Sequence, residues 1–484
     1  MLKHIVGVAL VTLMCAAAQV QGQTLNSAEA TWRASSRLGY GPSPKVVADI
    51  QQAGGAQKWA IQQIDLAHHA SQQPAKVPAS FTRFNQPMSD IFPAFEAERQ
   101  ARKAGQEKLQ KQDDAEPGAR RNEPEVFSRD AAREAAAWRV TACSHPDIEN
   151  PLLARMTEFW FNHLNVFAGK GPVRPFVGHY ELNVIRKHAL GKFEDLLLAS
   201  AQHPAMLFYL DQAQSVAEGS VGPKGQTRGL NENYARELLE LHTLGVNGGY
   251  TQRDVRDLAR ILTGWTVAPQ QESGFRFNAR THDNGDKLLM GTPYRNQGVQ
   301  EGEAAIRQLA RHPATAQRIA TRLAQFFVSD QPDQTLVRTL ANRFTTSQGD
   351  MRVVMLALIE NEAFWRSEHS LFKTPYDFAC SALLAINQAP DRQHTAQVLR
   401  FLNQAGQPVH GWQTPDGYAT DAATWLSPEA LTRRADFAIA LTRQMAPPDF
   451  LNVFLLTATR TRIGQEPTSM QAGLMLASPD FMRK

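Results

Sequence analysis

Cysteine and net charge are both scarce in this sequence. Its 484 residues include three cysteines, and 51 Lys and Arg stand against 47 Asp and Glu. Because nucleic-acid binders usually concentrate positive charge, this near-neutral balance argues against a nucleic-acid partner. No second long apolar run follows the N-terminal one, so no later membrane span is expected. Hydrophobic residues make up 43% of the chain, which is enough for a sizeable core.

The N-terminal segment has the pattern of a secretory signal peptide. Lys3 and His4 form a short basic start, residues 5–18 form an apolar run, and small residues follow as far as Gly22. The run is too short to span a bilayer comfortably, although an uncleaved anchor is the alternative. We therefore assign residues 1–22 to a signal peptide and expect an exported protein, periplasmic or extracellular. Its removal takes away one Lys and no acid, which leaves 50 basic against 47 acidic side chains.

Two cysteines, Cys143 and Cys380, remain after processing. They permit one disulfide in an oxidising compartment, but their wide separation in the chain has no signature of pairing. Two separate buried thiols are the expected arrangement.

Several catalytic and cofactor motifs are missing. The chain has no His-Glu-x-x-His, no closely spaced Cys pair and no Asp-rich calcium loop, so a divalent metal stays possible without any recognised ligand spacing. It has no Gly-x-Ser-x-Gly elbow, which disfavours a serine hydrolase of that type. The Gly-rich phosphate loops of nucleotide-binding proteins are missing as well.

Helical periodicity dominates what is present. Apolar residues recur at spacings of three and four over 152–163, 255–262, 306–313 and 319–327. Thr251 and Asp254 have the spacing of a capping pair that opens a helix. Strand signal is confined to residues 274–277, followed by a turn towards 287–289, which predicts one small hairpin. We expect a mainly α protein, with at most a small β-hairpin.

Composition also predicts a domain organisation. Residues 23–95 are expected to form an N-terminal helical lobe, and residues 134–484 one large helical domain that carries the site. Between them, residues 96–133 are dense in charged side chains and are interrupted by Pro117 and Pro124. This segment is expected to be an exposed linker that starts as a solvated helix.

One predicted helix, over residues 231–245, has an apolar stripe and a densely polar stripe. Glu232, Arg236 and Glu240 follow each other at i to i+4 steps, with Asn233 and Glu237 beside them. On an exposed face this is a chain of weak ion pairs. Facing a cleft, Glu237 and Glu240 can serve as metal ligands or a general base, and Arg236 can hold an anionic group. The spacing does not choose between the two.

The same segment resembles the bacterial family known as domain of unknown function 1800. The likeness continues through Gly249-Tyr-Thr251 to Leu262-Thr-Gly-Trp265 and extends over nearly the whole chain apart from the charged linker. Further similar stretches are Arg37-Leu-Gly-Tyr-Gly-Pro42, Met156-Thr-Glu-Phe-Trp-Phe-Asn-His163, His203-Pro-Ala-Met-Leu-Phe-Tyr-Leu-Asp211, Pro415-Asp-Gly-Tyr418 and Leu476-Ala-Ser-Pro-Asp-Phe481. The resemblance implies an exported, mainly helical protein, often encoded beside a partner of the unknown-function 1501 family, and implies no particular reaction.

Two positions depart from the family pattern. His242 stands where the family tends to have an aromatic residue such as Phe, so we expect it to be a packed substitute and not a ligand. Phe161 replaces a position that is often polar or His. A site that needed either side chain would be weakened by these departures.

Two functions from different classes follow. The first is an exported hydrolase, with or without a divalent metal, in which the polar stripe faces two histidines across a cleft. Its candidate catalytic residues are His163, His203, Arg236, Glu237 and Glu240, and its candidate substrate-binding residues are Asn162, Asp211, Glu232, Asn233, His282, Asp283, Trp412 and Tyr418. The second is a non-catalytic assembly or carrier protein that acts with an exported partner of the unknown-function 1501 type.

The loop that carries Trp412 and Tyr418 has a special place among these candidates. Its Pro, Asp and Gly residues enforce a turn, and we expect its aromatic side chains to lie near a cleft. In an exported protein such rings can stack on sugars, although core packing is the commoner fate of aromatic residues.

Overall fold

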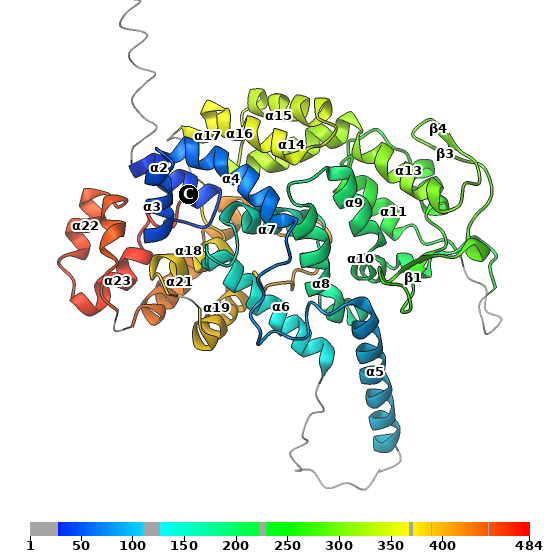
Figure 1. The fold of residues 1–484 in the computed structure, drawn as a ribbon, viewed down its shortest axis with the longest axis horizontal. Coiled ribbons are helices and arrows are strands. Elements are labelled where there is room, and N and C mark those ends of the chain that lie inside the picture. Colours follow the sequence, from blue (N-terminus) through cyan, green and yellow to red (C-terminus); the bar gives the residue numbers. More distant parts are fainter. Residues whose placement is uncertain (1–27, 111–125, 222–228, 367–370, 389, 444) are drawn as a thin grey trace, which may run out of the picture.

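The computed structural model describes residues 28–110, 126–221, 229–366, 371–388, 390–443 and 445–484. Within these ranges the protein is mainly α, as predicted, with two short hairpins (Figure 1). The predicted signal peptide lies outside the described residues. The helices are α2 (Ala28–Arg37), α3 (Pro44–Gln52), α4 (Ala56–Ser71), α5 (Met88–Gln110), α6 (Phe127–Ser144), α7 (Pro151–His163), α8 (Val177–Tyr180), α9 (Phe193–Gln202), α10 (Pro204–Tyr209), α11 (Asn233–Glu237), α12 (Gln252–Ile261), α13 (Val299–Ala310), α14 (Pro313–Phe327), α15 (Gln334–Thr346), α16 (Met351–Glu360), α17 (Glu362–Trp365), α18 (Pro375–Ala385), α19 (Arg392–Gln404), α20 (Ala422–Trp425), α21 (Pro428–Leu441), α22 (Thr457–Ile463) and α23 (Thr468–Leu476).

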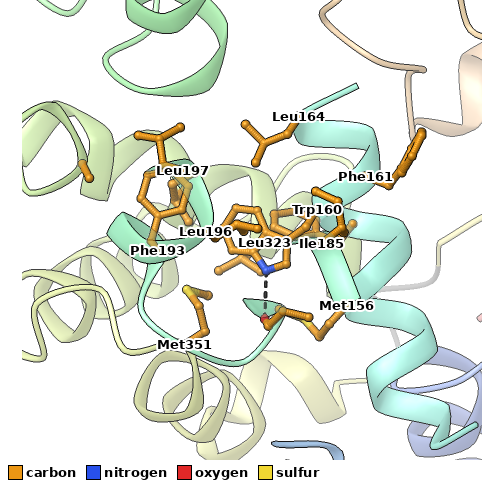
Figure 2. Packing of buried hydrophobic residues seen from close by; sticks show 14 of the residues in the cluster. Met156, Trp160, Phe161, Leu164, Ile185, Phe193, Leu196, Leu197, Leu323 and Met351 are labelled. Atoms are coloured by element: carbon orange, nitrogen blue, oxygen red, sulfur yellow. Dashed lines mark hydrogen bonds between the residues drawn. The ribbon is translucent and has the colours of Figure 1, made fainter. Parts of the chain in front are cut away.

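Helix α7 is the centre of the larger hydrophobic core. Asn150 caps its first turn by accepting a hydrogen bond from the amide of Leu153, and Pro151 occupies the first helical position, where a missing N–H costs nothing. Trp160 is fully buried and donates its indole N–H to the carbonyl oxygen of Ala189 at 2.9 Å (Figure 2). Phe193, at the start of α9, stacks on the same indole with ring centroids 5.3 Å apart.

The N-terminal helices share this core. Trp59 and Ile64 of α4 belong to the same hydrophobic cluster as Trp160, and α4 packs on both α7 and α16. The proposed boundary between a lobe ending at residue 95 and a main domain stays a prediction.

The predicted charged linker begins within α5, which projects from the body of the protein (Figure 1). Glu98 ties this helix to the start of α6, because its carboxylate accepts hydrogen bonds from the amide and hydroxyl of Ser128, both at 2.9 Å. Residues 111–125 lie outside the described part of the chain.

A second, smaller core lies around α18, α19 and α21. Here Cys143 of α6 and Cys380 of α18 form a disulfide with their Cα atoms 5.6 Å apart. The expectation of two separate thiols is therefore wrong. The reason is tertiary: α6 and α18 pack against each other, a contact that a separation of 237 positions in the sequence does not reveal.

The two hairpins correct the predicted strand pairing. Strand β2 (Phe275–Phe277) pairs with the preceding β1 (Trp265–Val267), and β3 (Lys287–Leu289) pairs with the following β4 (Thr292–Tyr294), all antiparallel. Both residues of the turn between β3 and β4, Met290 and Gly291, have positive φ, as tight hairpin turns require. The predicted single hairpin between 274–277 and 287–289 is therefore wrong.

The central polar segment is helical but does not form one continuous α-helix. Helix α11 continues into a π-helical turn at Leu238–His242, and the chain then leaves the helix at Thr243. Such turns displace part of the hydrogen-bonding ladder and often occur at functional sites. Here the turn leads directly into residues 244–247, which line the cavity described below.

Candidate functional site

The acidic and basic side chains of the polar stripe neutralise each other near the surface. The Arg236 guanidinium lies 3.4 Å from a carboxylate oxygen of Glu232 and 3.5 Å from one of Glu240, and it donates a hydrogen bond to Gln252. The Arg236 side chain is 38% exposed. This is the ion-pair alternative of the sequence analysis, and such exposed pairs each contribute well under about 1 kcal/mol.

His163 is buried in the core and away from that stripe. Its Nε2 donates to the backbone carbonyl oxygen of His242 at 3.0 Å, and its ring stacks against Phe159 and lies edge-on to Trp160. Burial, reinforced by the charge of Arg322, holds the pKa of His163 well below 6.5. The imidazole is therefore neutral and packs like an aromatic residue.

His203 has a structural role at the start of α10. Its Nδ1 accepts a hydrogen bond from the amide of Ala205 at 3.1 Å, so Nε2 holds the proton and donates it to Nδ1 of His179, also at 3.1 Å. Burial keeps the pKa of His203 well below 6.5 and lowers that of His179 to about 4. Neither His163 nor His203 lines the cavity described below.

Four of the candidate substrate-binding residues form ion pairs or hydrogen bonds within the protein or lie beside a buried carboxylate. Asp211 pairs with Lys170 at 2.8 Å, and Asn233 donates to the carbonyl oxygen of residue 210. Asp283 pairs with Arg260 at 2.8 Å. His282 is buried, with its Nε2 3.4 Å from the Glu301 carboxylate, which also pairs with Lys287. These contacts join α12, α13 and the hairpin region to one another.

Three other predicted residues do share a cavity: Asn162, Trp412 and Tyr418. They line a cleft of about 810 Å³ between α14, the turn at residues 244–247 and the loop at residues 412–421. The cleft opens at the surface, since Val246 at its rim is 71% exposed. Its size falls within the range of roughly 300–1,000 Å³ typical of small-molecule sites.

The loop that forms one wall of the cleft is held by neighbouring side chains. Asn162 accepts a hydrogen bond from the Tyr418 amide at 2.8 Å and donates to its carbonyl oxygen at 3.0 Å. Asn165 donates to the carbonyl oxygens of Trp412 and Thr414 at 3.1 and 2.8 Å. The two asparagine side chains thus form the hydrogen bonds to the loop backbone that a neighbouring β-strand would form in a sheet.

A buried ionic network supports the same wall from below. The Tyr418 hydroxyl donates to the carboxylate of Glu158, whose other oxygen lies 2.9 Å from the Arg155 guanidinium. Arg155 also pairs with Asp377, which pairs with Lys484. Despite burial, the neighbouring Arg155 and Lys484 charges hold the pKa of Asp377 below its usual value. Tyr418 is therefore anchored at both its backbone and its ring.

Two arginines on α14 form the opposite wall, and one of them lacks a partner. Arg318 donates its Nε–H to the carbonyl oxygen of Leu241 at 3.0 Å, which completes the end of the π-helical turn. Arg322, one turn further along, makes no hydrogen bond or ion pair with any residue that the structure describes. Burial and the charge of Arg318 lower the pKa of Arg322 to about 10. Asp416 attracts this guanidinium but does not reach ion-pairing distance.

Comparison of the sequence with known proteins identifies the family to which this chain belongs. A family model described as "Protein of unknown function (DUF1800)" matches residues 33–483. This chain belongs to the DUF1800 family. No match was found among curated proteins or among solved structures.

In this DUF1800 chain the arginine pair is the feature that sequence reasoning missed. The apolar spacing over residues 319–327 predicts part of α14 but says nothing of the arginines on its polar face. A signal was present, because two arginines at i and i+4 repel each other by about 0.2–0.5 kcal/mol and give the helix no local benefit.

Among the residues described, no group of three or more His, Cys, Asp or Glu side chains lies close enough together to hold a metal ion.

The same part of the chain contains no helix that is both long and apolar enough to cross a bilayer.

Proposed function

We propose that this protein is an exported binding protein that holds an anionic ligand in the cleft between α14 and the loop at residues 412–421. The observation that carries this proposal is Arg322, a half-buried arginine that lines a ligand-sized cavity and makes no hydrogen bond or ion pair with any described residue. Partial burial removes some of the water around this guanidinium, and an anion in the cleft would offset that loss.

The chemistry of the wall favours an anion. Arg318 and Arg322 present two cationic groups from one side of the same helix, while Arg318 is already fixed through its Nε–H. A guanidinium binds carboxylates and phosphates through two parallel N–H donors, which gives both strength and orientation. Burial and the like charge of Arg318 lower the pKa of Arg322, and a bound anion would oppose both effects.

The opposite wall supports binding over catalysis. Asn162, Asn165 and Glu158 hold the loop in one conformation before any ligand arrives. A preformed wall lowers the entropic cost of binding. None of the five residues predicted to be catalytic lines the cleft.

Export is part of the proposal and rests on two features. The basic and apolar N-terminal segment has the pattern of a secretory signal, and the disulfide between Cys143 and Cys380 suits an oxidising compartment. Secretion of the mature chain by cells that express the full-length gene, with its N-terminus determined by mass spectrometry, tests this part.

The anion site is tested by titration with simple anions. Inorganic phosphate, sulfate and benzoate are titrated into the purified protein at constant ionic strength, with isothermal calorimetry as the readout. Arg322→Gln is expected to weaken binding by about 10- to 100-fold, since a charge-assisted hydrogen bond contributes about 1.5–3 kcal/mol. Arg338→Gln on α15, an exposed arginine outside the cleft, is the matched control and is expected to bind normally. No binding of any anion, or equal binding by both variants, would contradict the proposal.

Hydrolysis is a second candidate, favoured by one observation. Glu237 has a raised pKa, caused first by burial and then by the charges of Glu240 and Asp416, and Asp416 lines the cleft. A raised pKa lets a carboxyl group keep its proton to a higher pH, which favours a role as a general acid. In a screen against chromogenic esters, glycosides and phosphates, with and without added divalent metal, Glu237→Gln should abolish hydrolysis while Glu232→Gln should not. No turnover by the unmodified protein would remove this candidate.

A carrier role with a partner remains compatible with ligand binding. The DUF1800 resemblance implies an exported partner of the unknown-function 1501 family. Co-expression of the two proteins with a tag on one of them, followed by size-exclusion chromatography, tests whether they form a stable complex.

A further inference from the structure

Exposed and half-buried amide side chains also line the cleft and are available to a ligand. The side-chain amides of Gln317, Gln325 and Asn247 line the cleft and make no hydrogen bond with any described residue. Each amide offers both a donor and an acceptor. Hydroxyl groups suit such amides because each hydroxyl can both donate and accept a hydrogen bond.

The cleft also has a fixed aromatic surface. The indole N–H of Trp412 donates to the Thr414 hydroxyl at 3.0 Å, and the Trp412 ring meets the Tyr418 ring edge-on with centroids 6.3 Å apart. The backbone of Trp412 is held by Asn165. These contacts hold a flat apolar ring at the cleft, which suits the C–H faces of a saturated ring.

The distribution of charge limits the ligand to few negative groups. The arginines lie on α14, whereas Asp416 and Asp421 line the cleft from the loop and Asp330 lines it just after the end of α14. A ligand with several anionic groups would bring one of them against these carboxylates, and like charges at short distance repel. A ligand with one anionic group at the arginine wall and hydroxyl groups at the loop wall satisfies both sides, since carboxylates accept hydrogen bonds from hydroxyls.

The volume excludes a bare inorganic ion as the best fit. A cleft of about 810 Å³ is near the upper part of the usual range for small-molecule sites, so the ligand has a sizeable body beyond its charged group. A short saccharide combines such a body with hydroxyl groups and C–H faces.

We propose that the ligand is an acidic saccharide with a single carboxylate, a uronic acid joined to a neutral sugar, whose carboxylate pairs with Arg322 and whose ring lies on Trp412. This inference rests on the proposed anion-binding function and specifies its ligand class.

A matched pair of disaccharides tests this inference. Cellobiouronic acid and cellobiose differ only in carrying a carboxylate or a hydroxymethyl group, and both are titrated into the full chain by calorimetry. We expect the acid to bind at least about tenfold more tightly than cellobiose. Arg322→Gln should remove that difference, Trp412→Ala should weaken binding of both sugars, and Arg338→Gln should change neither.

Further titrations separate this inference from the proposed function. Trigalacturonate, which has three carboxylates, is expected to bind more weakly than cellobiouronate because of Asp416 and Asp421. If benzoate or phosphate binds through Arg322 and cellobiouronate does not, the anion site stands and the saccharide inference is overturned. Binding of a tripeptide with a free C-terminus but not of the saccharide overturns it in favour of a peptide. If no anion binds at all, both proposals fail.

Discussion

Replacement of His242 by Phe is expected to stabilise the protein. The imidazole is fully buried, and neither ring nitrogen has a hydrogen-bond partner among the described residues. An unpaired buried polar group costs about 1–3 kcal/mol. Phe removes both unpaired nitrogens but is slightly larger, and overpacking can cost about 1–3 kcal/mol. Since the family resemblance places an aromatic residue here, we expect a net gain of about 1–2 kcal/mol at pH 7.5.

The effect of pH on this variant separates polarity from packing. Burial, with the charges of Arg318 and Arg322, lowers the pKa of His242 to about 3, whereas an unfolded histidine titrates near 6.5. Between these values only the unfolded state gains the proton, so the stability of the unmodified protein falls as pH decreases. At pH 5.5, one unit below 6.5, this amounts to about 1.4 kcal/mol. The advantage of His242→Phe should therefore grow by about that amount between pH 7.5 and pH 5.5.

Urea unfolding at both pH values measures the two quantities. His163→Phe is the matched control, because His163 is equally buried but donates a hydrogen bond to the His242 carbonyl oxygen. At pH 7.5 it should lose about 1–2 kcal/mol, the opposite sign to His242→Phe. A destabilised His242→Phe would show that the extra volume outweighs the unpaired nitrogens. An advantage that does not change with pH would show that the pKa of His242 is the same in the folded and unfolded protein.

Two further perturbations test features on which the cleft depends. Replacing Cys143 and Cys380 by Ser should lower the free energy of unfolding by about 2–5 kcal/mol in oxidising buffer, and a reducing agent should bring the unmodified protein to the level of the variant. Asn162→Ala should cost about 1–3 kcal/mol, because it leaves the buried amide and carbonyl of Tyr418 without their partners, and it should weaken anion binding together with stability. Unchanged anion affinity in that variant would show that the loop does not shape the site.

The parts of the fold that the sequence predicts are those with local causes. Periodic apolar residues predict α7, α12 and α14, and the capping box of Thr251 and Asp254 is present as expected. The pairing of strands and of cysteines depends instead on which distant elements pack together. No spacing within a short window contains that information, and both predictions were wrong for this reason.

The candidate site shows the same difference between features with local causes and features that depend on distant parts of the chain. The loop of Trp412 and Tyr418 was predicted from its own turn residues, and it does line a cleft. The stripe around Arg236 was a candidate because its polar residues follow each other at i to i+4 steps, and His163 was a candidate because of its residue type. Their roles depend on burial and on the surrounding elements: Arg236 lies among exposed acids, and His163 lies among core aromatic rings.

The shape of the cleft loop depends on hydrogen bonds to its backbone, whereas its ligand specificity depends on its side chains. The loop is held through hydrogen bonds from Asn162, Asn165 and Tyr209 to its backbone groups. Every residue type except proline has both a backbone N–H and a backbone C=O, so these hydrogen bonds do not depend on the side chains of the loop. Side chains such as those of Thr420 and Gln413 can therefore be exchanged without loss of these anchors. The backbone of the loop is therefore fixed while its side chains can change. Variants with other side chains at these positions can evolve, or be engineered, to bind different ligands.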